Sequence, residues 1–211
     1  MNRCVRYCIT FFLLFLTPVV MADAPITQYF SKKFNKINSF LSQNHEKAQN
    51  NPELLVGFVD SELLQVWSAK NTLRAMLGNK RWEQLSNAET EQLIVAYEET
   101  IRRYLYEVLQ QYQDQIATVE SVRLNSKGNK GWLRVKLESS ALPNFDVDLK
   151  IYKDDDLWTV YDFSFQGISF VKMKRGFFRH TYDSEGLEGV IDTLNKKNHK
   201  FKQTVMVAGD E

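Results

Sequence analysis

The stretch that decides the fold is Tyr161-Asp-Phe-Ser-Phe-Gln-Gly-Ile-Ser-Phe-Val-Lys-Met-Lys-Arg-Gly-Phe-Phe-Arg179. Its first five residues alternate as at the end of a strand, Gly167 interrupts the alternation, and the remainder has the apolar spacing of a helix start. Eight large apolar side chains fall within sixteen positions: Phe163, Phe165, Ile168, Phe170, Val171, Met173, Phe177 and Phe178. A strand-turn-helix corner needs fewer for its own packing, so this one either fills a core or lines a cavity.

The N-terminus is expected to be a secretory signal peptide over residues 1–22. Arg3 and Arg6 give it a positive start, residues 9–21 form an apolar run, and small residues allow cleavage after Ala22. A transmembrane anchor is the alternative, but thirteen residues that include Pro18 are fewer than the roughly 20 needed to span a bilayer. Residues 23–211 are then of a length that favours a single domain.

Composition narrows the function of the exported chain. Both cysteines, Cys4 and Cys8, lie within the expected signal peptide, so disulfides and thiolate catalysis are excluded from the mature protein. A cysteine-free exported chain suits a bacterial periplasm. Without Arg3 and Arg6, 25 basic residues face 26 acidic ones, so no net charge attracts nucleic acid or anionic membranes.

The N-terminal half has the periodicity of helices. A helix is expected over residues 23–50, a second from Asn51 as cap and Pro52 as first residue, and a short third one over 71–77 that Gly78 closes. The first carries the apolar stripe Ile26, Phe30, Phe34, Ile37 and Leu41. Such a stripe identifies the buried face of an amphipathic helix.

The longest predicted helix follows Ser86, which with Glu89 forms a capping box. Its stripe consists of Leu93, Tyr97, Ile101, Tyr104, Leu105, Val108 and Tyr112. The periodicity shows which face is buried but not whether that face packs in a core or lines a ligand.

From Ala117 onward the period changes from 3.6 to 2, which predicts strands. Four are expected, near residues 119–124, 133–138, 145–151 and 157–165, joined as an antiparallel meander. One face is polar, so the other must be covered by the helices before and after the meander. The fold class is therefore α+β, with N-terminal and C-terminal helices covering one face of a four-stranded sheet and enclosing an apolar cavity. Ser184 is expected to cap a last helix that ends in the polar run 195–200.

A search for catalytic chemistry finds no recognised motif. His45, His180 and His199 are scattered without metal-ligand spacing, so no metal and no cofactor are expected. The nucleophile elbow fails because Val171 stands where its second glycine should be. Asp162 is the one candidate acid or base in a cavity, and no catalytic residue is assigned.

Several short motifs occur in order along the chain: Val160-Tyr-Asp162, Gly167-Ile-Ser-Phe-Val171, Lys174-Arg-Gly-Phe-Phe178, Gly186-Leu-Glu-Gly-Val-Ile-Asp-Thr-Leu194 and, upstream, Leu77-Gly78 with Trp82, Leu85, Ser86 and Glu89. Together they resemble the MlaC family, also described as toluene-tolerance periplasmic proteins. The resemblance covers about residues 50–200. Phe170 stands where the family usually has an aliphatic residue, and residues 23–50 show no match.

The resemblance implies a periplasmic carrier that holds a phospholipid by its acyl chains. Its implied partners are an inner-membrane ABC transporter complex and an outer-membrane lipoprotein complex of the Mla type. The implied carrier moves phospholipid between these two complexes and so maintains outer-membrane lipid asymmetry. Two other interpretations remain open from the residues: a small-cavity enzyme acting on an apolar substrate through Asp162, and an adaptor whose apolar stripes are only core.

The residues expected to line the lipid-binding cavity are chosen by the face of the helix or strand on which each lies and by proximity to the corner at residues 161–179. They are Tyr104, Leu105, Val108, Leu133, Val147, Leu149, Phe163, Ile168, Val171 and Phe177. Beside them, Lys174 and Arg175 are candidates to contact a head group or a partner.

Overall fold

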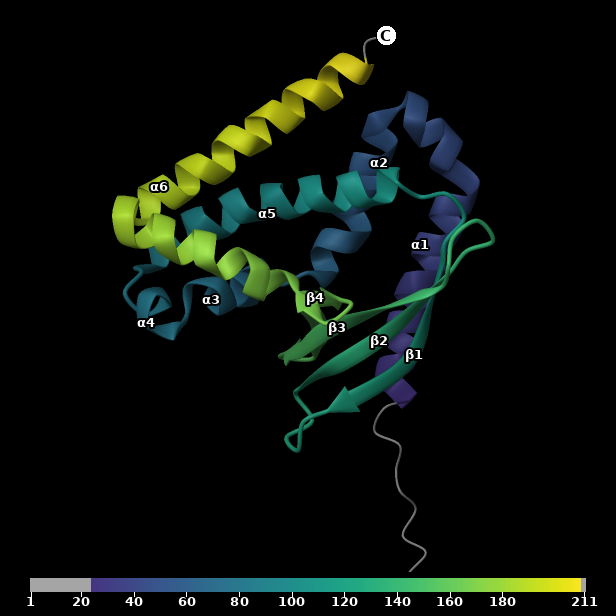
Figure 1. Cartoon of the computed structure of the whole chain (residues 1–211), viewed down its shortest axis with the longest axis horizontal. Helices are drawn as coiled ribbons and strands as arrows, with labels where there is room; N and C mark the ends of the chain where they lie inside the picture. Colours follow the sequence, from purple (N-terminus) through teal and green to yellow (C-terminus); the bar gives the residue numbers. More distant parts are fainter. Residues whose placement is uncertain (1–23, 210–211) are drawn as a thin grey trace, which may run out of the picture.

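A computed structural model describes residues 24–209 as a set of helices packed on one antiparallel sheet (Figure 1). The chain runs through five α-helices, then the sheet, then one long helix. The fold is therefore α+β, as predicted. The expected signal peptide over residues 1–22 lies outside the described residues.

The first helices follow the predicted pattern. They are α1 (Ala24–Asn50), α2 (Pro52–Phe58), a π-helical turn η1 (Val59–Leu63) and a 3₁₀ turn η2 (Leu64–Val66). Pro52 lies in the first turn of α2, where a backbone N–H would have no partner within the helix, so its missing N–H costs no hydrogen bond. Asn51 occupies the N-cap position as predicted, but its side chain makes no capping hydrogen bond.

Three further helices complete the N-terminal half: α3 (Ala69–Leu77), α4 (Asn79–Trp82) and α5 (Asn87–Gln110). Gly78 closes α3 at φ 85°, a backbone conformation that favours glycine. The predicted capping box is present, since the Glu89 N–H donates to the Ser86 hydroxyl and the Glu89 carboxylate accepts from the Ser86 N–H.

The sheet contains five strands in sequential order, each antiparallel to its neighbour. They are β1 (Ile116–Leu124), β2 (Lys130–Glu138), β3 (Phe145–Asp154), β4 (Leu157–Phe165) and the short β5 (Ile168–Ser169). The four predicted strands are confirmed, and β5 is an addition. Gln166 and Gly167 join β4 to β5 with φ of 49° and 78°, as a two-residue hairpin of the primed type requires.

A β-bulge at Tyr161 changes which residues of β4 face the helices. Ile151 pairs with Val160 and Lys150 pairs with Asp162, so Tyr161 is one extra residue. If the side chains of β4 alternated strictly after Val160, Asp162 would lie on the same side of the sheet as Val160. The bulge instead places Phe163 there and turns Asp162 to the side of Lys150.

Asp162 anchors the start of the last helix, α6 (Phe170–Gly209). Its fully buried carboxylate accepts hydrogen bonds from Lys150 Nζ (2.7 Å), the Ser169 hydroxyl (2.7 Å) and the Val171 N–H (2.9 Å). Ser169 is the N-cap, since its Oγ also accepts from the Lys172 N–H at 3.1 Å. One carboxylate thus joins β3, β4, β5 and α6.

The helix α6 consists of two halves that meet at Gly186, whose φ of 71° and ψ of −169° are not helical. Figure 1 shows the chain bending back at this point, with α5 in the angle. Two predictions are corrected here. Ser184 is not an N-cap, because its hydroxyl donates to the His180 carbonyl in the preceding turn, and the helix continues to Gly209 rather than ending near Lys200.

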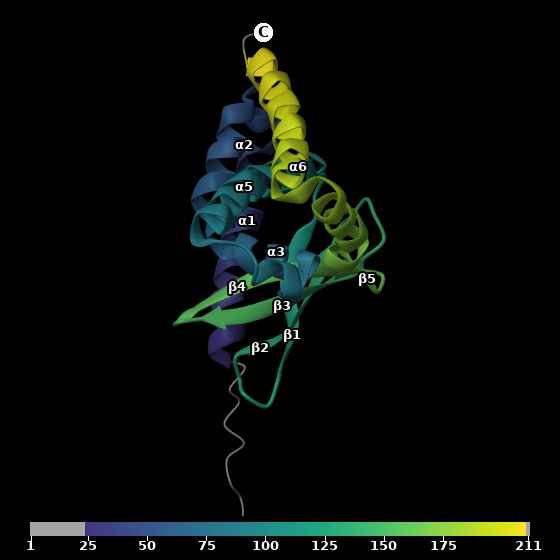
Figure 2. The ribbon, with the colours of Figure 1, turned by 90° about the vertical axis from the view of Figure 1, so that its left-hand side faces the viewer.

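Three apolar cores hold these elements together. One joins α3, α5 and α6 around Leu93, one joins α1 to the sheet around Leu133, and one joins α1, α2 and α5 around Leu55. Figure 2 and Figure 1 both place α5 between the outer half of α6 and the sheet. The cover on the inner face of the sheet is therefore divided between α1 and the α5–α6 pair.

Replacing Asp162 by Asn should destabilise the protein by about 2–4 kcal/mol, because the amide carries no charge to pair with Lys150 and has an NH₂ donor in place of one of the two acceptor oxygens. Urea unfolding followed by circular dichroism measures this change.

The matched control is Asp148→Asn, which removes a carboxylate that pairs with the partly exposed Arg134. It should cost less than about 1 kcal/mol. Equal stability of the Asp162 variant and the unmodified protein would contradict the anchoring role.

Candidate binding cavity

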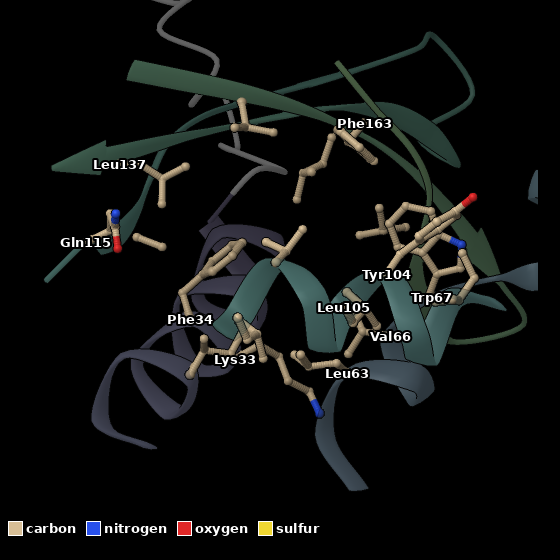
Figure 3. A pocket seen from close by; sticks show the side chains of 18 of the residues that line it. Lys33, Phe34, Leu63, Val66, Trp67, Tyr104, Leu105, Gln115, Leu137 and Phe163 are labelled. Atoms are coloured by element: carbon tan, nitrogen blue, oxygen red, sulfur yellow. The ribbon is translucent and has the colours of Figure 1, made fainter. Parts of the chain in front are cut away.

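A cavity of about 740 Å³ lies between the sheet, α1, α5 and the start of α6 (Figure 3). It occurs where the three cores meet, since its wall takes Phe30 from one, Leu41 from another and Ile101 from the third. Its volume falls within the roughly 300–1,000 Å³ range of small-molecule sites. Val108 is on the wall and is 67% exposed, which shows that the cavity opens to solvent.

The wall is mostly apolar. The helix α1 supplies Phe30, Phe34, Ile37 and Leu41; α5 supplies Ile101, Tyr104, Leu105 and Val108; the sheet supplies Leu137, Phe145, Val147, Leu149, Val160 and Phe163. In Figure 3, Phe34, Leu137, Leu105 and Phe163 converge on the same space from these different elements. Such a wall favours hydrocarbon as the occupant.

Few wall residues carry charge, and both carboxylates among them are paired. Glu62 pairs with Lys36, and Glu107 pairs with Arg103 at 3.0 Å. Lys33 and Lys174 are the cations on the wall. None of these groups forms the adjacent acid and base that a hydrolytic site requires.

The structure brings six of the ten predicted wall residues together at this cavity: Tyr104, Leu105, Val108, Val147, Leu149 and Phe163. Lys174 also lies on the wall, where its Nζ is 5.6 Å from the centre of the Tyr104 ring and 5.8 Å from that of Phe170. Phe163 and Phe170 both line the cavity and stack with ring centres 5.0 Å apart, so the strand-turn-helix corner at residues 161–179 contributes to the wall.

The other four predicted wall residues lie elsewhere. Leu133 faces the correct side of the sheet but is buried beneath α1, and Val171 is buried against α3 and α5. Ile168 is 64% exposed in the β4–β5 hairpin, and Phe177 lines a smaller pocket. Arg175 is not among the wall residues either. The alternation of a strand shows which side of the sheet a residue faces, but it could not show which part of that side α1 would cover.

Sequence reasoning missed the contribution of α1 to the cavity. Phe30, Phe34, Ile37 and Leu41 are four of the five residues in its apolar stripe. The stripe was visible in the sequence, yet its periodicity could not distinguish a core from a cavity wall. Leu63, Val66 and Trp67 were also missed as wall residues; Leu63 is the last residue of the π-helical turn η1 and Val66 the last residue of the 3₁₀ turn η2.

Comparison with protein families matches residues 31–196 to the family described as MlaC protein. The chain belongs to the MlaC family. The match begins within α1 and ends within α6, so it covers every element that lines the cavity. The MlaC family resemblance drawn from the short motifs is therefore confirmed, and it extends into α1, where no motif had been found.

A solved structure of similar fold provides a further comparison. The phospholipid-binding protein from Ralstonia solanacearum, solved in complex with a phospholipid, superposes with a TM-score of 0.71 at 15% sequence identity. The superposition covers 83% of this chain and 98% of that one. At this identity the likeness establishes the shared fold. Comparison with curated proteins finds no significant match.

Among residues 24–209, none of the helices combines the length and the hydropathy that a membrane span requires. The same residues contain no group of three or more His, Cys, Asp or Glu side chains that could hold a metal ion.

Replacing Leu149 by Glu should abolish the binding of apolar molecules. A carboxylate on this wall would have to be desolvated by an occupying hydrocarbon, at a cost of several kcal/mol. Titration with a fluorescent fatty-acid analogue should show at least a tenfold loss of affinity.

Leu157→Glu is the matched control, since Leu157 is 65% exposed on β4 and is not a wall residue. It should bind the analogue normally. Normal binding by a folded Leu149 variant would show that the cavity is not where apolar molecules bind.

Proposed function

We propose that this protein is a periplasmic carrier of phospholipids, which it holds by the acyl chains. The observation that carries the proposal is the open cavity of about 740 Å³ with its apolar wall. A protein that only transmits contacts between partners has no need for such a space, because unfilled apolar volume costs stability. The adaptor interpretation is accordingly the weaker one.

Physical chemistry explains why such a carrier is required. Two acyl chains contain on the order of 30 methylenes, and at about 0.8 kcal/mol each their exposure to water costs roughly 25 kcal/mol. An unassisted phospholipid therefore crosses an aqueous compartment very slowly. A cavity that replaces water by side chains such as Phe34, Leu105 and Leu149 removes most of that cost.

The comparisons support the same function. The chain belongs to the MlaC family, and a protein of the same fold was solved with a phospholipid bound. We extend the proposal to the family's transport role: exchange of phospholipid between an inner-membrane ABC transporter complex and an outer-membrane lipoprotein complex of the Mla type, which maintains outer-membrane lipid asymmetry.

The enzymatic alternative relied on Asp162, and its geometry does not favour that role. Asp162 is not a wall residue of the cavity, and its carboxylate accepts three hydrogen bonds from Lys150, Ser169 and Val171. A general base must lie within hydrogen-bond reach of the proton that it abstracts from its substrate. We therefore propose a non-enzymatic function in which Asp162 supports the fold.

The protein purified from the periplasm without detergent should contain bound phospholipid, and it should accelerate phospholipid transfer between donor and acceptor vesicles. Mass spectrometry of an organic extract and a fluorescence-dequenching assay with labelled lipid measure the two effects. The Leu157→Glu variant should behave like the unmodified protein, whereas Leu149→Glu should lose both. Absence of lipid together with unassisted transfer rates would refute the proposal.

Export can be tested separately. Expressed with its own N-terminus in a Gram-negative bacterium, the chain should be released by osmotic shock, and its intact mass should correspond to a protein that begins at Asp23. Retention of residues 1–22 on a cytoplasmic product would contradict the periplasmic location.

A further inference from the structure

A second, smaller pocket adjoins the cavity and differs from it in chemistry. It measures about 270 Å³ and lies between α5 and the two halves of α6, which the bend at Gly186 brings to opposite sides of it. Tyr104, Phe170, Met173 and Lys174 belong to both walls, so the two spaces are adjacent. These four side chains separate a molecule in the large cavity from the small pocket.

Three cations line the small pocket and no acidic residue does. Arg103 comes from α5, Lys174 from the first half of α6, and Lys197 from the second half. In residues 24–203 neither lysine has a carboxylate within ion-pair distance, and their ring contacts are with Tyr104, Phe170 and Phe177. Arg103 uses Nη1 for Glu107 at 3.0 Å, whereas its buried Nε has no hydrogen-bond partner.

Hydroxyl groups complete this wall. Thr100, Thr193 and Tyr97 contribute to it, and the Tyr97 hydroxyl is buried without a hydrogen-bond partner. A buried donor without a partner is uncommon and calls for an explanation such as an absent ligand. Burial raises the pKa of the Tyr97 phenol well above its ordinary value, with smaller contributions from Tyr104 and Asp162, so the hydroxyl keeps its proton at neutral pH.

We infer that this pocket binds a phosphate group. Three convergent cations, a free guanidinium N–H and an unpaired hydroxyl are donors suited to a tetrahedral oxyanion, which offers acceptors in several directions. Adjacency to the large cavity makes the phosphate of a bound phospholipid the main source, so this inference rests on the proposed function. Inorganic phosphate has the same chemistry and is the other source.

The first arm of the test compares phosphatidic acid with diacylglycerol of the same acyl chains, both as competitors of the fluorescent fatty-acid analogue. The unmodified protein should bind phosphatidic acid about tenfold or more tightly than diacylglycerol, because charge-assisted hydrogen bonds are among the strongest. The variant Arg103→Gln/Lys197→Gln changes residues outside the large cavity. It should bring the ratio close to one by weakening phosphatidic acid alone.

The matched control is Lys172→Gln/Lys196→Gln, which removes two exposed cations of α6 that do not line the pocket. It has the same change in net charge and should keep the ratio of the unmodified protein. Loss of preference in this control too would mean that overall charge attracts the lipid, and the site would be rejected.

The second arm titrates the lipid-free protein with inorganic phosphate and follows the phosphorus NMR signal. Saturable binding that the Arg103/Lys197 variant loses would support the pocket as a site for free phosphate even if the two lipids bind equally. Equal lipid affinities with no phosphate binding would overturn the inference while leaving the carrier function intact. Failure of both lipids to compete would instead refute the carrier function, and the lipid phosphate site with it.

Discussion

The carboxylate of Asp162 fixes the position of the C-terminal helix α6 relative to the sheet. It lies fully buried between the sheet and α6 and accepts from Lys150 on β3, Ser169 at the end of β5 and the Val171 N–H in the first turn of α6. A buried charge is tolerated only when it is paired and hydrogen-bonded, so these three donors must come together for the fold to form. The direction in which α6 leaves the sheet follows from that requirement.

The bulge at Tyr161 allows β4 to supply both the buried Asp162 carboxylate and apolar side chains for the cavity wall. By adding one residue to β4 it lets Val160 and Phe163 face the same side, while Asp162 turns to the side of Lys150. The Tyr161 carbonyl remains satisfied because the Thr72 hydroxyl of α3 donates to it at 2.8 Å. Phe163 then stacks on Phe170 at the cavity wall. One irregular residue thus separates the buried charge from the apolar space.

The cavity exists because three cores meet without filling the volume between them. Each core is built from its own set of elements, and all three contribute side chains to the cavity wall. Hydrocarbon can occupy this space without strain, because the cavity wall has few polar groups that need a hydrogen-bond partner. The small pocket between α5 and α6 has the opposite character, with Arg103, Lys174 and Lys197 on its wall. Together they match the two ends of an amphiphile.

The sequence by itself determined the long helices α1 and α5, the four longer strands, the α+β class and the family. Helices such as 87–110 and strands such as 145–154 follow from local periodicity and caps, and ordered motifs identified the MlaC resemblance. Only the tertiary structure decided that α1 forms a wall, that Leu133 and Val171 are core, and that Asp162 binds the first turn of α6 away from the cavity wall. The reason is physical: periodicity shows which face of an element is buried, but what covers that face depends on partners distant in the chain.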